Sequence, residues 1–310
     1  MALSTPILLI TFNRPQHTQR VLSAILAAEP RDIYIFQDGP REGNDKDRLK
    51  CQEVRDVVNE LTSAYAVSHP QFTLHTLYQE QNLGCGPGPV KGISWFFDQV
   101  EQGIVMEDDC MPHLDFFAYC EELLDRYKNN HQVQFINATL YHNRWHCADS
   151  YGFSHYMITG AWAAWRETWQ GFDLDLHRLN AWSARKQILH LTENRAEANW
   201  WYFKIKEIQK DTEKKSYWDY QMQIHLFMNS AITIHPAVNL ISNIGFDAEG
   251  THTTWNDGYG NRSVSPILPL QHPVQIFIDT SMDADCFAKR QSRGRIIDTL
   301  SFIKHLCKNL

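Results

Sequence analysis

The sequence predicts an α/β fold in which a mixed, mainly parallel sheet is flanked by helices. Short apolar runs of strand length alternate with longer segments that carry apolar residues at helical spacing, and this rhythm continues over residues 6–128. Turns marked by polar residues, Gly or Pro close the apolar runs. The chain has 310 residues, of which 43% are hydrophobic and 21% charged, as expected for a globular protein with a sizeable core.

Each apolar run in this first part is expected to form a strand, and each amphipathic segment a helix. The predicted strands are 6–12, 33–37, 72–78 and 104–107, and the predicted helices are 18–28, 49–65, 90–100 and 116–128. In parallel sheets, ligands bind at the carboxyl ends of the strands, where the loops gather. Three polar groups are therefore expected at one edge, namely residues 11–14, Asp38 and residues 107–109.

The second part of the chain is less regular. Strands are predicted at 135–137 and 231–241, although Pro236 weakens the latter, and helices at 179–193, 200–215 and 219–229. Segment 243–263 is rich in Gly, Asn, Asp and Thr, and its length favours a lid or binding loop. Residues 286–310 carry six basic residues against one acid and predict a basic amphipathic helix, either docked on the acidic body or lying on a membrane surface.

Composition excludes several classes of function. The net charge of −7 argues against a general nucleic-acid binder. Seven scattered cysteines without a CxxC pair favour reduced thiols in a cytoplasmic protein over a disulfide framework. A zinc site at His142, His146 and Cys147 lacks a fourth ligand. The N-terminus is interpreted as a first strand and not as a signal peptide, and no apolar stretch approaches the roughly 20 residues of a membrane span.

The segment GIVMEDDCMP, residues 103–112, places three carboxylates after an apolar strand. Such a cluster can bind a divalent metal, act as an acid/base pair or form salt bridges. Mg²⁺ and Mn²⁺ prefer carboxylate oxygens and commonly bridge them to phosphates. Arg14 and Lys91 are cations suited to phosphate oxygens, and Asp38 is suited to a ribose or nucleobase. Neither a P-loop nor a GxGxxG fingerprint is present, which argues against a nicotinamide enzyme.

Six segments taken in order carry a resemblance to a known family. They are PILLITFNRP, IFQDGP, GIVMEDDCMPHLDFFAY, TGAWAAWRETW, YWDYQMQ and NLISNIGFDAEGTH. Over about residues 6–255 the chain resembles the GT-A class of nucleotide-sugar glycosyltransferases. Within that class it is most similar to the N-acetylglucosaminyltransferases of N-glycan synthesis, of which the type I enzyme is an example, and to their bacterial relatives.

The resemblance implies a role for individual residues. Asp109 would be the direct ligand of Mn²⁺ or Mg²⁺, Asp219 the catalytic base on the acceptor side, and His252 a ligand of the metal or diphosphate. The nucleotide and donor sugar would lie against Thr11, Asn13, Arg14, Asp38, Glu107, Asp108, Gly160 and Trp162. Lys91 is a further candidate for donor binding, although its Gly/Pro-rich segment departs from the family pattern. One domain over 1–285 is implied, with a nucleotide-binding half at 1–130 and an acceptor-binding half at 131–285.

The implied reaction is an inverting transfer of a sugar from a nucleotide diphosphate, with UDP favoured by resemblance, to a hydroxyl of a glycan or lipid-linked acceptor. Two alternatives stay open: a sugar nucleotidyltransferase, although the first strand lacks the Gly-rich loop typical of those enzymes, and a non-catalytic sugar- or nucleotide-binding module. Asp219 could instead cap the helix that follows it, and His252 could simply be solvated. The expected location is the cytoplasm, with a peripheral membrane contact through 286–310 as the alternative to docking.

Overall fold

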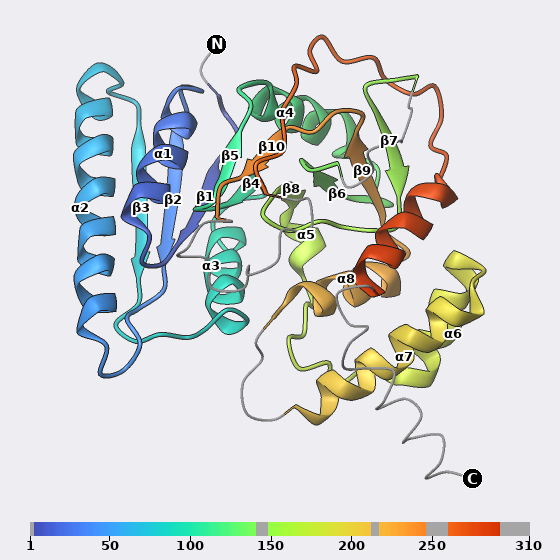
Figure 1. Cartoon of the computed structure of the whole chain (residues 1–310). Coiled ribbons are helices and arrows are strands. Elements are labelled where there is room, and N and C mark those ends of the chain that lie inside the picture. Colours follow the sequence, from blue (N-terminus) through green and yellow to red (C-terminus); the bar gives the residue numbers. More distant parts are fainter. Residues whose placement is uncertain (1–2, 141–147, 212–216, 246–259, 292–310) are drawn as a thin grey trace.

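An eight-stranded mixed sheet runs through the centre of the molecule, as the computed structural model shows (Figure 1). The structure describes residues 3–140, 148–211, 217–245 and 260–291. The strand order is β3-β2-β1-β4-β8-β6-β9-β7. The strands are β1 (Ile7–Thr11), β2 (Asp32–Gln37), β3 (Thr73–Tyr78), β4 (Gln102–Glu107), β6 (Val133–Asn137), β7 (Tyr151–Ser154), β8 (Ala161–Trp165) and β9 (Ile232–Pro236).

The first four strands of this order are mutually parallel, whereas β8 runs antiparallel to both of its neighbours. In the register of β1, Thr11 pairs with Gln37 and Ile10 pairs with Glu107. The carboxyl ends of β1, β2 and β4 therefore lie level with one another at the same edge. This confirms the predicted mainly parallel sheet and the expected meeting of three polar groups.

Alternation along the central strands sends successive side chains to opposite faces of the sheet. Ile7 and Leu9 of β1 pack in a cluster with α1 (Pro15–Leu26), α2 (Asp45–Ser68) and α4 (Asp115–Tyr127). Leu8 and Ile10 pack in a second cluster with α3 (Pro87–Phe97), α5 (Arg166–Trp169) and α8 (Asp219–Met228). Because both faces are covered, β1 and β2 are apolar almost throughout.

A third apolar cluster joins α6 (Ala181–Thr192), α7 (Arg195–Lys210), α8 and a helix over residues 280–291. These helices lie at the opposite end of the molecule from α2 (Figure 1). Met282, Cys286 and Phe287 are buried there, so helix 280–291 is docked on the body of the protein. It runs through the predicted boundary at residue 285, and residues 292–310 of the predicted basic helix lie outside the described residues.

A separate two-stranded sheet pairs β5 (Cys110–Pro112) with β10 (Ile241–Asn243) in antiparallel fashion. The predicted strand at 231–241 is wrong in its length, because β9 ends at Pro236 and β10 begins in another sheet. The strands β5, β7 and β8 were not predicted. In the described residues, no helix combines the length and the apolar character needed to cross a membrane. Cys51, Cys85, Cys110, Cys120 and Cys286 are free cysteines in the described part of the chain.

Candidate active site at the edge of the sheet

A cavity of ≈ 460 Å³ lies at the carboxyl ends of β1, β2 and β4. Seven of the predicted site residues line it: Thr11, Arg14, Asp38, Glu107, Asp108, Asp109 and Gly160. These residues are separated in the sequence by up to about half the length of the chain, and the fold of the sheet brings them together. Cavities at this position are the usual binding sites of open α/β sheets.

Arg14 is the cation that contacts the acidic cluster. It occupies the N-cap position of α1, where its side chain makes no capping bond, and Pro15 begins the helix. Its Nη1 lies 3.1 Å from Oδ2 of Asp109 and 3.7 Å from Oδ1 of Asp108. All three side chains are largely buried. The guanidinium therefore compensates part of the negative charge that follows β4.

Asp109 is also held by the segment that contains β10. The side-chain amide of Asn243 donates to its Oδ1 at 3.3 Å, and the backbone N–H of Ile244 donates to its carbonyl oxygen at 2.8 Å. A Cβ atom on Gly245 would lie within van der Waals overlap of the Asp109 side chain, so only glycine fits this close approach. The carboxylate is therefore placed by contacts from both halves of the chain.

The neighbouring acids lie in a site that disfavours negative charge. Burial, and then the charge of Asp109, raises the pKa of Glu107 to about 8. The same two causes raise the pKa of Asp108 to about 7, although Arg14 acts against them. Three acidic side chains thus share one arginine, and Glu107 and Asp108 resist ionisation as long as no further positive charge is near. A bound cation would favour their ionised forms.

The carboxylate oxygens of the cavity are of the kind that a hard divalent cation prefers. In the described residues, no group of three or more His, Cys, Asp or Glu side chains is arranged around one point. The oxygens present fit a different mode, in which one carboxylate, here Asp109, holds the ion and substrate phosphates and water complete its shell. His252, the second predicted ligand, lies outside the described residues.

Asp38 shapes one wall of the cavity. Its carboxylate accepts hydrogen bonds from the backbone N–H groups of Gly39, Leu83 and Gly84 at 2.9, 2.8 and 3.1 Å, and from the side chain of Asn82 at 3.0 Å. Burial raises the pKa of Asp38, and the three backbone donors act in the opposite direction. Because its oxygens are bonded within the protein, Asp38 orders the wall-forming loop.

Gly160 and Thr11 line the cavity through backbone or short side-chain atoms. Gly160 has φ +103°, and a Cβ there would lie 2.9 Å from Sγ of Cys110, so its position requires glycine. Its carbonyl oxygen accepts the N–H of Glu107 at 2.8 Å, which ties the acidic segment to the turn before β8. The Thr11 hydroxyl donates to the carbonyl oxygen of Phe36 at 3.1 Å.

Three predicted donor-binding residues do not line the cavity. The Asn13 side chain donates to Asp47 at 2.8 Å. Lys91 is exposed and donates to the side chain of Gln79 at 2.7 Å. Trp162 is 1% exposed, because it packs in the second apolar cluster against other rings. Its aromatic side chain belongs to the core beneath the site.

Asp219 is the first residue of α8, and its predecessor Trp218 is the N-cap and lines the cavity. The structure shows no side-chain capping bond at this helix, so the capping alternative is wrong in its geometry. The charge of Asp219 contributes to the raised pKa of Glu107, which places the two carboxylates within electrostatic reach. Its side chain is 31% exposed and pairs with Arg290 at 3.4 Å.

Sequence reasoning missed several residues of the site. Arg41, Asn82, Trp218, Asn243 and Gly245 line the cavity without having been singled out. Asn243 and Gly245 fall inside the NLISNIGFDAEGTH segment, and Trp218 inside YWDYQMQ, so the family resemblance carried a signal for these three. Arg41 follows the second strand, and nothing in the sequence alone indicates that it turns towards the cavity.

No protein-family model matches the chain, and no curated protein matches it. Similar solved structures include glucosyl-3-phosphoglycerate synthase from Mycobacterium tuberculosis in complex with Mn²⁺, UDP and glucosyl-3-phosphoglycerate. It has 12% identity and a TM-score of 0.31, over 53% of this chain and 58% of the synthase. The chain thus matches less than two thirds of that synthase's length.

A putative glucose-1-phosphate thymidylyltransferase from Bacillus anthracis is similar at 13% identity and a TM-score of 0.33, over 73% of this chain and 94% of that one. A 4-diphosphocytidyl-2C-methyl-D-erythritol synthase from Anaerococcus prevotii is similar at 7% identity and a TM-score of 0.29, over 73% of this chain and 97% of that one. Scores of this size describe partial overlap of backbones and assign no function to this chain.

Proposed function

We propose that the protein is a metal-dependent glycosyltransferase that moves a sugar from a nucleotide diphosphate to an acceptor hydroxyl with inversion. The observation that carries the proposal is the meeting of Arg14 with Asp108 and Asp109 in the lining of the cavity. A buried cation beside an excess of carboxylates suits a ligand that brings both phosphates and a divalent cation. The six motif segments that resemble GT-A enzymes support the same proposal.

Charge on the leaving group is the main barrier to such a transfer. As the bond between the anomeric carbon and the diphosphate oxygen breaks, its electron pair passes to that oxygen. Mn²⁺ or Mg²⁺, when bound, would supply positive charge there. Arg14 lies beside Asp109 and would donate to the same phosphate oxygens, stabilising the charge as it develops.

Asp219 is the proposed general base. It would accept the proton of the acceptor hydroxyl while that oxygen bonds to the anomeric carbon. Its place at the N-terminus of α8, next to the cavity-lining Trp218, supports this role. A single displacement at carbon inverts its configuration. N-acetylhexosaminyl or hexosyl transfer from a UDP-sugar to a glycan or lipid-linked acceptor is the form that the resemblance favours.

A panel of nucleotide sugars, with simple glycosides and water as acceptors, tests the proposal. We expect Mn²⁺-dependent release of the nucleoside diphosphate and a product of inverted anomeric configuration, measured by NMR. Release of pyrophosphate from a nucleoside triphosphate and a sugar 1-phosphate would identify a nucleotidyltransferase instead. Binding of a nucleotide sugar without turnover, in the presence of all acceptors and Mn²⁺, would indicate a non-catalytic module.

A further inference from the structure

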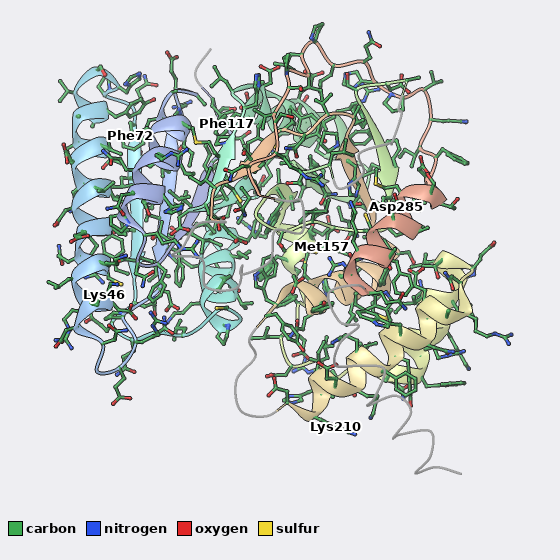
Figure 2. All side chains as sticks on the ribbon, viewed as in Figure 1. Lys46, Phe72, Phe117, Met157, Lys210 and Asp285 are labelled. Carbon is green, nitrogen blue, oxygen red and sulfur yellow. The ribbon has the colours of Figure 1, made fainter. Side chains whose placement is uncertain are left out.

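Helix 280–291 brings a buried arginine to the proposed base. Nη1 of Arg290 lies 3.4 Å from Oδ2 of Asp219, and its Nη2 donates to the carbonyl oxygen of Met157 at 2.9 Å. Figure 2 shows Met157 near the middle of the molecule, beside the helix that carries Asp285. The two partners in the ion pair are 71 residues apart in the sequence, so the fold alone brings them together.

The guanidinium of Arg290 lies among three aromatic rings. Its Cζ lies 5.5 Å from the ring centre of Tyr220 and 5.9 Å from those of Tyr156 and Trp201. The side chain is 10% exposed, in contrast to most arginines of a protein surface. Aromatic faces attract a guanidinium and restrict its orientation. Together with the carbonyl of Met157, they hold this cation in one place.

The helix itself is anchored from within the fold. The carboxylate of Asp283 accepts hydrogen bonds from the Ser154 hydroxyl at 2.5 Å and from the backbone N–H and Nδ1 of His155 at 2.9 and 2.8 Å. These partners lie at and just after the end of β7, in the central sheet. The position of Arg290 is therefore set by the sheet, because Asp283 anchors the helix about two turns before Arg290.

We infer that Arg290 is a positioning residue that fixes the carboxylate of Asp219 for proton transfer, an inference that rests on the proposed function. Oδ2 of Asp219 pairs with Arg290, whereas its Oδ1 has no hydrogen-bond partner among the described residues. The ion pair thus selects one orientation of the carboxylate and keeps the second oxygen available for the acceptor hydroxyl. Orientation of a base by a fixed partner raises the rate of transfer without adding to donor binding.

The test is a double-mutant cycle on the full chain. Nucleoside diphosphate release from the panel of nucleotide sugars with Mn²⁺ is measured for wild type, Asp219→Asn, Arg290→Met and the double variant. Arg290→Lys retains the charge, and Lys289→Met removes a cation one residue away as the control. Calorimetric titration with UDP and Mn²⁺ and thermal unfolding of each variant separate catalysis from binding and from loss of structure.

We expect Arg290→Met to lower kcat about 10- to 100-fold while the Kd for UDP stays within about twofold, and Arg290→Lys to restore part of the loss. In the double variant the loss should equal that of Asp219→Asn alone, because Arg290 acts through that carboxylate. Two results would overturn the inference: an Arg290→Met rate like that of wild type, or losses that multiply in the double variant.

Failure of the proposed function can be distinguished from failure of the inference about Arg290. It is visible in wild type and Asp219→Asn before any Arg290 variant is measured. If wild type releases no nucleotide from any donor, or if Asp219→Asn matches wild type, Asp219 is not a base and the role assigned to Arg290 is overturned with it. If Arg290→Met does not fold, Arg290→Lys takes its place in the cycle. The rates of Arg290→Lys and of the double variant Arg290→Lys/Asp219→Asn then decide whether the two losses multiply.

Discussion

Arg14 and Asp109 form a 3.1 Å ion pair across the carboxyl ends of β1 and β4. Without ligand, the arginine is thus the partner of the acidic segment that follows β4. A metal–diphosphate ligand would bring phosphate oxygens to the guanidinium and a cation to the carboxylate at the same time. The pair therefore places two binding groups side by side. Donor binding is expected to depend on the loss of this ion pair, as the guanidinium binds phosphate oxygens and the carboxylate binds the cation.

Replacing Arg14 should weaken nucleotide binding. We expect Arg14→Met to raise the Kd of UDP with Mn²⁺ at least about tenfold, because about 1.4 kcal/mol of phosphate attraction is lost. Calorimetric titration measures this change. Arg20→Met, at an exposed position of the same helix, is the matched control and should bind as wild type does. Equal affinity in the Arg14 and Arg20 variants would show that the diphosphate lies elsewhere.

Replacing Asp219 should lower the rate of sugar transfer and leave the affinity for the donor nucleotide unchanged. For Asp219→Asn we expect kcat to fall by about 10²- to 10⁴-fold, as is typical for loss of a general base, with an unchanged Kd for UDP. Steady-state release of nucleotide and calorimetry give the two quantities. A variant with a normal kcat, or one that loses UDP binding in proportion to its rate, would contradict the assigned role.

The contact between Gly245 and Asp109 should be sensitive to a single methyl group. We expect Gly245→Ala to displace either the carboxylate or the segment after β10, at a cost of about 1–3 kcal/mol in unfolding free energy. Nucleotide affinity in Mn²⁺ should fall with it. Asn243→Ala is the comparison without an added methyl group, since it removes the amide that donates to Asp109 at 3.3 Å and accepts from the N–H of Gly245 at 2.8 Å. A Gly245→Ala protein as stable and as tightly binding as wild type would argue against this placement of the loop.

Glu197 should make stability depend on pH. Burial raises its pKa to about 7, although the hydroxyl of Tyr156, which donates to it at 2.5 Å, acts in the opposite direction. The folded protein then holds a proton that the unfolded chain releases near pH 4.5. Its contribution to stability is full at low pH and is lost as pH rises through about 7. Glu197→Gln should flatten the decrease in unfolding free energy between about pH 5 and 7, measured by urea denaturation. Parallel curves for the two proteins would contradict the assigned pKa.

The sequence was sufficient for the parts of the fold that depend on local pattern. Continuous apolar runs identified β1, β2 and β4 because both faces of the sheet are covered, and the resulting parallel order placed Arg14, Asp38 and Asp109 at one edge. The strands β5 and β7 have only three and four residues, too few for a periodicity to be recognised. β9 and β10 looked like one strand because the apolar run continues through the turn between them.

Side-chain partners could not be read from local pattern. The burial of Trp162 in an aromatic cluster could not be predicted, since neighbours such as Phe135 come from distant segments. Arg290 appeared only as one of several basic residues near the C-terminus. Its burial depends on rings contributed by β7, α7 and α8 and their flanks, and such a pocket is a product of tertiary packing.

The central claim, that the acidic segment after β4 binds a metal–nucleotide complex, is tested most directly by calorimetric titration. Nucleoside diphosphates are titrated with and without Mn²⁺ into wild type, Asp109→Ala and the control Asp125→Ala, whose acid is exposed on α4. The account predicts tight binding of one nucleotide that requires Mn²⁺, is lost in Asp109→Ala and is retained in Asp125→Ala. Binding that is indifferent to Mn²⁺ and to Asp109, or no binding of any nucleotide, would contradict it.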